Sequence, residues 1–172
     1  MSSHVYHEIY LHLNWHVKDD KATLTPALEP IVQQIITDRI HRTSGVWLHG
    51  INGTETHIHI AINIEPQVCI SDLVKDLKGG SSFDTNKKQG KGSLEWQRGY
   101  GVVSFGKNNL PWVLEYIAKQ KEHHAAGKEI ERMEKCDVDE EATTGTATTP
   151  TPTTTQTPAT TQTPAQTPAH EV

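Results

Sequence analysis

The clearest pattern in the chain is a strict alternation of hydrophobic and polar side chains over residues 56–64. Isoleucine fills every even position from Ile58 to Ile64, while the odd positions begin with His57 and His59. A period of two is typical of a half-buried β-strand. The segment is therefore predicted to bury its isoleucines and to present both imidazoles on its other face.

A second alternating segment runs from Val5 to Val17 and predicts the first strand. Leu11, Leu13 and Trp15 belong to its hydrophobic side, and the opposite side is rich in Tyr, His and Asn. A strand of this kind packs one face on a core. The polar face could form part of a binding surface or be simply solvated.

A helix is predicted to begin at Thr25-Pro26, because Thr is a favoured N-cap and Pro is tolerated at the first helical position. Gly45 should end it, and Val46 to Ile51 then predicts a strand. The dipeptide Asn52-Gly53 is a typical hairpin turn leading into the histidine strand. These two strands are therefore expected to be antiparallel neighbours.

The middle of the chain predicts a second helix that begins at Ser71-Asp72. We expect a loop at Lys78-Gly79-Gly80-Ser81-Ser82, where glycines and hydroxyls would let the backbone approach a phosphate. The residues from Asn86 to Ser93 predict a flexible basic loop, which is either a contact for backbone phosphates or a solvated run of charge. A further strand is expected from Gln97 to Phe105.

The last helix is predicted from Leu110 to about Ala126, capped by Asn108 or Asn109. Its helical spacing produces two stripes of side chains. The first is expected to face the core and contains Val113, Leu114, Ile117 and Ala118. The second places a tyrosine, an amide and imidazoles on one face, and it contains Trp112, Tyr116, Gln120 and either His123 or His124.

The order of these elements predicts an α+β, ferredoxin-like fold, with helices packed on an antiparallel sheet. Residues 1–128 should form this domain, followed by an acidic helical extension or linker at 129–141. Residues 142–172 consist largely of Thr, Pro, Ala and Gln and are expected to be disordered. Neither a signal peptide nor a membrane span is evident, so a cytoplasmic location is expected.

The net charge and the cysteine content exclude only a few of the possible functions and metal sites. The net charge of -5 gives no positive support for nucleic-acid binding, although the acidic excess lies in Glu129 to Glu141. Cys69 and Cys136 lack C-x-x-C spacing, so neither a disulfide framework nor a thiolate zinc site is indicated. Side chains two apart on a strand point the same way, so His57 and His59 could form half of a metal site or could merely decorate a solvent face.

Four motifs, taken in order, resemble one known family: the HUH single-tyrosine transposases of small bacterial insertion sequences, including relatives associated with repetitive extragenic palindromes. The resemblance covers most of residues 4–126. The motifs are His57-Ile58-His59, Asp76-Leu77-Lys78-Gly79-Gly80-Ser81-Ser82, Trp96-Gln97-Arg98-Gly99-Tyr100-Gly101 and Tyr116-Ile117-Ala118-Lys119-Gln120-Lys121-Glu122-His123-His124.

The resemblance implies that His57, His59 and Gln120 hold a divalent metal, Mg or Mn, and that Tyr116 is the nucleophile. It also implies cleavage and rejoining of single-stranded DNA with hairpins, through a 5′-phosphotyrosine, by a homodimer. Tyr116 and Gln120 are one helical turn apart, which agrees with this assignment. The candidates for phosphate contacts are Lys75, Lys78, Lys87, Lys88, Lys91 and Arg98.

Two departures from the family pattern leave alternatives open. Thr56 stands where the family often has an acidic residue, which affects how the ligand His57 is oriented. The acidic segment and the Thr/Pro tail are also additions. A second hypothesis is therefore a DNA-binding module of the same fold that has lost its cleavage activity. A zinc-dependent hydrolase is disfavoured, because the chain has no H-E-x-x-H motif and no evident carboxylate base.

Overall fold

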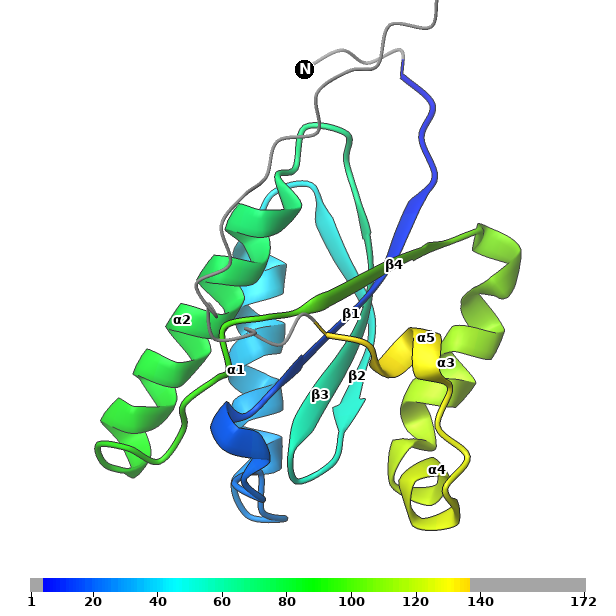
Figure 1. The fold of residues 1–172 in the computed structure, drawn as a ribbon. Coiled ribbons are helices and arrows are strands. Elements are labelled where there is room, and N and C mark those ends of the chain that lie inside the picture. Colours follow the sequence, from blue (N-terminus) through cyan, green and yellow to red (C-terminus); the bar gives the residue numbers. More distant parts are fainter. Residues whose placement is uncertain (1–4, 137–172) are drawn as a thin grey trace, which may run out of the picture. The chain divides into compact units, whose positions relative to one another are not determined.

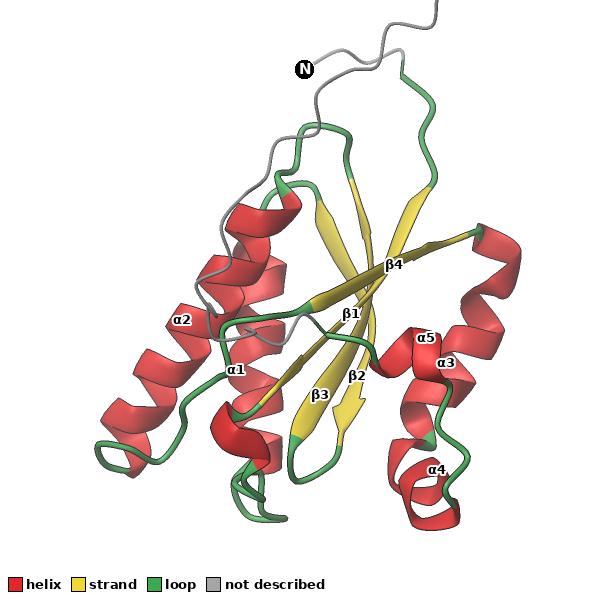
Figure 2. Ribbon diagram, viewed as in Figure 1, coloured by secondary structure: helices red, strands yellow, loops and turns green. Residues whose placement is uncertain are grey.

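The computed structural model describes residues 5–136, which form a four-stranded antiparallel sheet with helices on both faces (Figures 1 and 2). The predicted tail at 142–172 and the end of the acidic segment, 137–141, lie outside the described residues. In chain order the elements are β1 (Ile9–His16), the 3-10 turn η1 (Lys18–Asp20), α1 (Glu29–Arg42), β2 (Val46–Gly53), β3 (His57–Ile64), α2 (Ile70–Gln89), β4 (Gly101–Phe105), the 3-10 turn η2 (Lys107–Asn109), α3 (Leu110–Ala118), α4 (Gln120–Ala126) and α5 (Glu131–Glu134).

The strand order is β2-β3-β1-β4, with every neighbouring pair antiparallel. This order is that of the predicted ferredoxin-like α+β fold. The expected pairing of the second strand with the histidine strand is confirmed, since Val46 lies opposite Ile64. Strands β1 and β4 are shorter than predicted, because pairing begins only at Ile9 and Gly101. No helix in the described part of the chain is long and apolar enough to cross a membrane.

The two faces of the sheet carry different helices. The isoleucines of β3 and the apolar side of β1 pack against α1 and α2 in the main core, which includes Leu13, Trp15, Ile36, Ile60 and Leu77. Helices α3, α4 and α5 lie on the opposite face (Figure 1). There Ala61, Val113, Tyr116, Ile117 and Met133 form a smaller apolar cluster. The period-two pattern of β3 thus separates a purely apolar face from the face that carries the histidines.

The expected loop at residues 78–82 is wrong, because α2 runs without a break through Gly79 and Gly80. Packing against α1 explains why a glycine is accommodated at position 80. A Cβ on Gly80 would collide with the guanidinium of Arg39, which crosses the helix to reach Asp84 at 2.8 Å. Tertiary packing therefore outweighs the poor helix propensity of glycine. The basic loop predicted from Asn86 is likewise helical up to Gln89.

The turn between β2 and β3 is also not where the sequence suggested. Asn52 and Gly53 belong to β2, and the chain reverses over residues 54–56. The Asn52 amide instead donates hydrogen bonds to the carbonyls of Ile117 and Ala118, at 3.0 Å each. These carbonyls lie at the end of α3, where helical acceptors lose their partners. Asn52 therefore caps a helix rather than forming a turn.

Two helix boundaries differ from the prediction. Helix α1 begins at Glu29, and Thr25 instead accepts a hydrogen bond from the backbone amide of Leu28 at 3.3 Å. The predicted single helix from Leu110 to Ala126 is broken at Lys119, whose φ and ψ are -98° and 18°. Because of the break, Tyr116 lies in the last turn of α3 and Gln120 begins α4.

Candidate metal and nucleophile site

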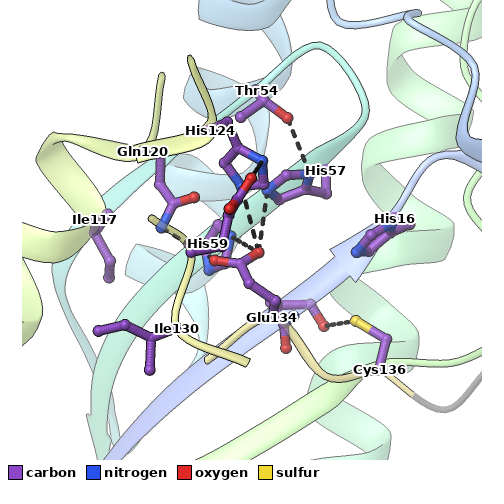
Figure 3. Close-up of polar contacts among 12 residues, drawn as sticks. His16, Thr54, His57, His59, Ile117, Gln120, His124, Ile130, Glu134 and Cys136 are labelled. Atoms are coloured by element: carbon purple, nitrogen blue, oxygen red, sulfur yellow. Dashed lines mark hydrogen bonds and ion pairs between the residues drawn. The ribbon is translucent and has the colours of Figure 1, made fainter. Parts of the chain in front are cut away.

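His57 and His59 lie on β3, facing α3 to α5, and both side chains are buried. Their rings meet at 79°, with centroids 4.9 Å apart. The Nε2 atoms of the two rings lie 3.4 Å and 3.2 Å from a single oxygen, Oε2 of Glu134. Figure 3 shows this carboxylate pointing into the group of imidazoles formed by His57, His59 and His124. The strand thus aims two ring nitrogens at one point.

The other nitrogen of each ring is engaged by a neighbour. His57 Nδ1 lies 2.9 Å from Thr54 Oγ1 and 3.0 Å from Thr56 Oγ1, and His59 Nδ1 lies 2.8 Å from His12 Nε2. When Nδ1 carries the hydrogen and donates it to these acceptors, Nε2 is left as the free ligand atom. Two threonine hydroxyls therefore contact His57 Nδ1, and one of them belongs to Thr56, the residue directly before it.

Tyr116 and Gln120 reach the same point from α3 and α4. Tyr116 is only 3% exposed, and its hydroxyl donates to Glu134 Oε1 and accepts from the backbone N–H of Ile130 at 3.1 Å. Gln120 is fully buried, with Nε2 3.5 Å from Glu134 Oε1. Its Oε1 has no hydrogen-bond partner among residues 5–136. The structure thus brings together all four residues predicted for the metal and the nucleophile.

Glu134 and His12 were not identified from the sequence. Glu134 lies on α5, within an acidic run that has no periodicity to distinguish one carboxylate from the next. His12 is fully buried on β1, and its ring stacks on that of His59 with centroids 5.0 Å apart. The alternation of the first strand did place His12 on the polar face. In the register of the two strands His12 lies opposite Ala61, and only the side-chain contact in the structure shows that it reaches His59.

The protonation states follow from burial. Burial lowers the pKa of His12 and of His57 to about 3, and it also lowers the pKa of His59, so the three imidazoles are neutral near pH 7. Burial raises the pKa of the Tyr116 phenol to about 12, and its hydrogen bond to Glu134 acts in the same direction. Burial also raises the pKa of Glu134, but His59, Tyr116 and His57 outweigh it and lower that pKa to about 2.

The donor set fits a divalent metal. Ligand atoms of His57, His59, His124 and Glu134 all lie within 4.8 Å of one another. Within the described residues, the Nε2 atoms of the three histidines and Oε1 of Gln120 are buried without a hydrogen-bond partner. Buried polar atoms are normally satisfied, so an unpartnered group of this kind calls for an ion or a water. The cluster can therefore hold a metal ion.

The residues predicted to contact DNA phosphates lie elsewhere. Lys75, Lys87 and Lys88 are exposed on α2, on the face of the sheet opposite α3 and α4 (Figure 1), and Lys91 follows that helix. Lys78 donates to the carbonyls of Gln97, Arg98 and Gly99 at 2.5–2.8 Å. A cavity of about 680 Å³ is lined in part by Lys18, Lys78, Trp96 and Arg98. Contact of these residues with DNA stays a prediction.

Comparison with known proteins gives consistent matches. A family model described as "Transposase IS200 like" matches residues 5–120. The ISDra2 transposase TnpA of Deinococcus radiodurans is 25% identical over 120 residues, which cover 66% of this chain and 85% of that protein.

Two solved structures share the fold. One, from Deinococcus radiodurans R1 and assigned as a transposase, has a TM-score of 0.56 at 22% identity, covering 70% of this chain and 96% of its own. The other is a REP-associated tyrosine transposase bound to a REP hairpin, with a TM-score of 0.53 at 11% identity, covering 75% of this chain and 76% of its own. Because the family model spans well over half of the residues, the chain belongs to the IS200-like transposase family.

Proposed function

We propose that this transposase is a metal-dependent tyrosine DNA strand transferase. It would cleave and rejoin single-stranded DNA at hairpin-containing ends through a 5′-phosphotyrosine intermediate. The observation that best supports this is the convergence of Tyr116, Gln120, His57 and His59 on one carboxylate, although they come from three separate elements. A hairpin substrate is further supported by the structural neighbour that binds a REP hairpin.

His57, His59 and Gln120 would hold Mg or Mn through two neutral imidazoles and an amide oxygen, which leave the charge of the ion undiminished. When bound, such an ion would polarise the scissile phosphodiester and stabilise the negative charge of the transition state. The buried atoms that lack partners within residues 5–136, namely both Nε2 atoms and Gln120 Oε1, would serve as its ligands.

Tyr116 supplies the nucleophile. Its Oη would attack phosphorus and form a P–O bond while the 3′-oxygen leaves, giving a 5′-phosphotyrosine and a 3′-hydroxyl. The ester retains the energy of the broken bond, so a second 3′-hydroxyl can reverse the step without ATP. With its pKa raised to about 12, the phenol is protonated at rest. Glu134 Oε1 is the acceptor that faces this proton.

The substrate can approach the phenol from a defined side. A cavity of about 220 Å³ beside Tyr116 is lined by Trp112, Glu115, Lys119, His123 and Ile130. Trp112 is half exposed, and its ring lies over Tyr116 at 16° with centroids 5.9 Å apart. Exposed aromatic rings commonly stack bases of single-stranded DNA. The cavity therefore offers a position for a base or a phosphate group of the substrate next to the nucleophile.

The test is a cleavage reaction with single-stranded hairpin DNA from the flanks of the gene, labelled at either the 5′ or the 3′ end. Wild-type protein and Tyr116→Phe are compared with Mg, Mn or EDTA on denaturing gels. We expect a metal-dependent adduct with the DNA downstream of the cut, absent from the variant. Binding without any adduct would support the alternative of a module that has lost cleavage.

The homodimer is a separate part of the proposal and is tested independently. Equilibrium sedimentation of the full-length protein at micromolar concentration should give twice the chain mass of 19.1 kDa. A single species at the chain mass would contradict the dimer and would leave the proposed chemistry unaffected.

A further inference from the structure

We infer that Glu134 is itself a ligand of the metal, through Oε2, while its other oxygen, Oε1, positions Tyr116. The inference rests on the proposed function, because it assigns a further residue to the same metal. It goes beyond the family resemblance, since Glu134 lies outside residues 5–120, the part of the chain that matches the family model.

The distances around Oε2 are those between ligands that share an ion. Oε2 lies 3.4 Å from His57 Nε2, 3.2 Å from His59 Nε2 and 3.6 Å from His124 Nε2. Ligands at about 2.1 Å from a common ion are separated by roughly 3.0 Å in octahedral and 3.4 Å in tetrahedral geometry. Oε2 therefore occupies a position that a ligand beside the two β3 imidazoles would take.

A direct hydrogen bond explains the arrangement less well. Charge-assisted N–H···O bonds are typically about 2.7–2.9 Å long. The contacts of Oε2 with His57 and His59 are longer, and neither Nε2 atom has a hydrogen-bond partner within residues 5–136. Each Nδ1 atom, in contrast, has an acceptor at 3.0 Å or less. When each Nδ1 donates its hydrogen to that acceptor, the ring turns the lone pair of Nε2 toward the carboxylate.

The segment that carries Glu134 is held firmly in place. Met133 is buried in the apolar cluster beneath α3. The N–H of Ile130 donates to the Tyr116 hydroxyl at 3.1 Å. On the other side, a Cβ on Gly101 would collide with the carbonyl of Lys135, so the glycine allows this segment to lie directly against β4. The position of the carboxylate is therefore determined by the packing on both sides of it.

This assignment changes the chemistry of the site in two ways. A carboxylate adds one negative charge to a neutral donor set, which strengthens cation binding. In addition, Oε1 accepts the hydrogen bond of Tyr116, so one side chain fixes the nucleophile relative to the ion.

The test is Mn binding by the full-length protein, measured from the EPR signal of free Mn without DNA. Glu134→Gln keeps the shape of the side chain and should weaken Mn binding at least about tenfold. Glu131→Gln is the matched control, since Glu131 is an exposed residue of the same short helix, and it should bind like wild type. Wild-type affinity in Glu134→Gln would overturn the inference.

Two further measurements separate the possible causes of failure. Tyr116→Phe should bind Mn normally even though it forms no adduct with DNA. Loss of the adduct therefore tests the proposed nucleophile, and it does not test whether Glu134 is a metal ligand. If Glu134→Gln does not fold by circular dichroism, pulsed EPR of Mn-loaded wild-type protein with ¹³C-carboxylate glutamate replaces it. A strong carboxylate-carbon coupling is expected, and its absence would overturn the assignment.

Discussion

His12 on β1 contacts His59 on β3 through a 2.8 Å distance between Nε2 and Nδ1. The two rings are nearly parallel, at 27°, and both are fully buried. When Nδ1 of His59 donates its hydrogen to His12, Nε2 keeps a free lone pair that faces the cluster. His12 is therefore a positioning residue for the proposed ligand His59.

Removing this partner should weaken metal binding. His12→Ala is expected to reduce Mn affinity by about 10- to 100-fold, because the ring of His59 loses the acceptor that fixes its orientation. His12→Gln, which can still accept through its amide oxygen, should recover part of the loss. His49→Ala is the control, since His49 bonds Asn63 at 2.7 Å instead of a site residue. Equal affinities for His12→Ala and His49→Ala would refute this role.

The two threonines next to His57 should be partly redundant. Thr54 and Thr56 both offer a hydroxyl to His57 Nδ1, at 2.9 Å and 3.0 Å. Either single change to Ala leaves one acceptor and should lower Mn affinity by no more than about threefold, whereas the double change should approach the effect of His12→Ala. Calorimetric titration of the four proteins checks this. Additive effects of the single changes would show that the hydroxyls act independently.

The adjacent glycines of α2 should respond oppositely to alanine. Gly79 has open space around its Cα, so Gly79→Ala should stabilise the helix by about 0.5–1 kcal/mol. Gly80→Ala would displace the guanidinium of Arg39 from Asp84 and should lower the free energy of unfolding by about 1–2 kcal/mol. Urea unfolding of the two variants measures the difference. Equal midpoints would contradict the contact between Gly80 and Arg39.

The metal-free protein should lose stability as the pH falls from about 6.5 toward 3. Burial holds the pKa of His12 and of His57 at about 3, against 6.5 for an unperturbed histidine. In this range the unfolded chain binds protons that the folded chain does not. The free energy of unfolding should therefore decrease by up to about 1.4 kcal/mol per pH unit for each imidazole.

Urea midpoints in EDTA at about pH 7 and about pH 5 test this dependence. His12→Gln removes one of the buried imidazoles, so its midpoint should fall less between the two conditions. Identical midpoints for the wild type at both pH values would contradict the account of neutral, buried histidines.

The sequence was most informative where one element alone determines the geometry. The alternation of β3 predicts that His57 and His59 face away from the isoleucines, because a strand has a period of two whatever surrounds it. The spacing of Tyr116 and Gln120 similarly predicted that they lie close together, although a break at Lys119 separates their helices.

The sequence predictions fail where contacts with residues far away in the chain determine the local structure. Asn52-Gly53 has the composition of a turn, but the Asn52 amide donates hydrogen bonds to two carbonyls of α3, more than sixty residues away in the sequence. Gly79-Gly80 has the composition of a loop, but it lies within α2, where Gly80 packs closely against Arg39 of α1. Glu134 resembles every other acid in its segment, and only the path of the chain over β4 brings it to the histidines.

The most direct test of the proposed chemistry identifies the amino acid that becomes joined to DNA. Wild-type protein is reacted with the hairpin substrate in Mn, digested with a protease and a nuclease, and analysed by mass spectrometry. We predict a nucleotide linked through its 5′ phosphate to the peptide that contains Tyr116. A link to one of the other three tyrosines, Tyr6, Tyr10 or Tyr100, or no linked peptide from a reaction that cleaves DNA, would contradict it.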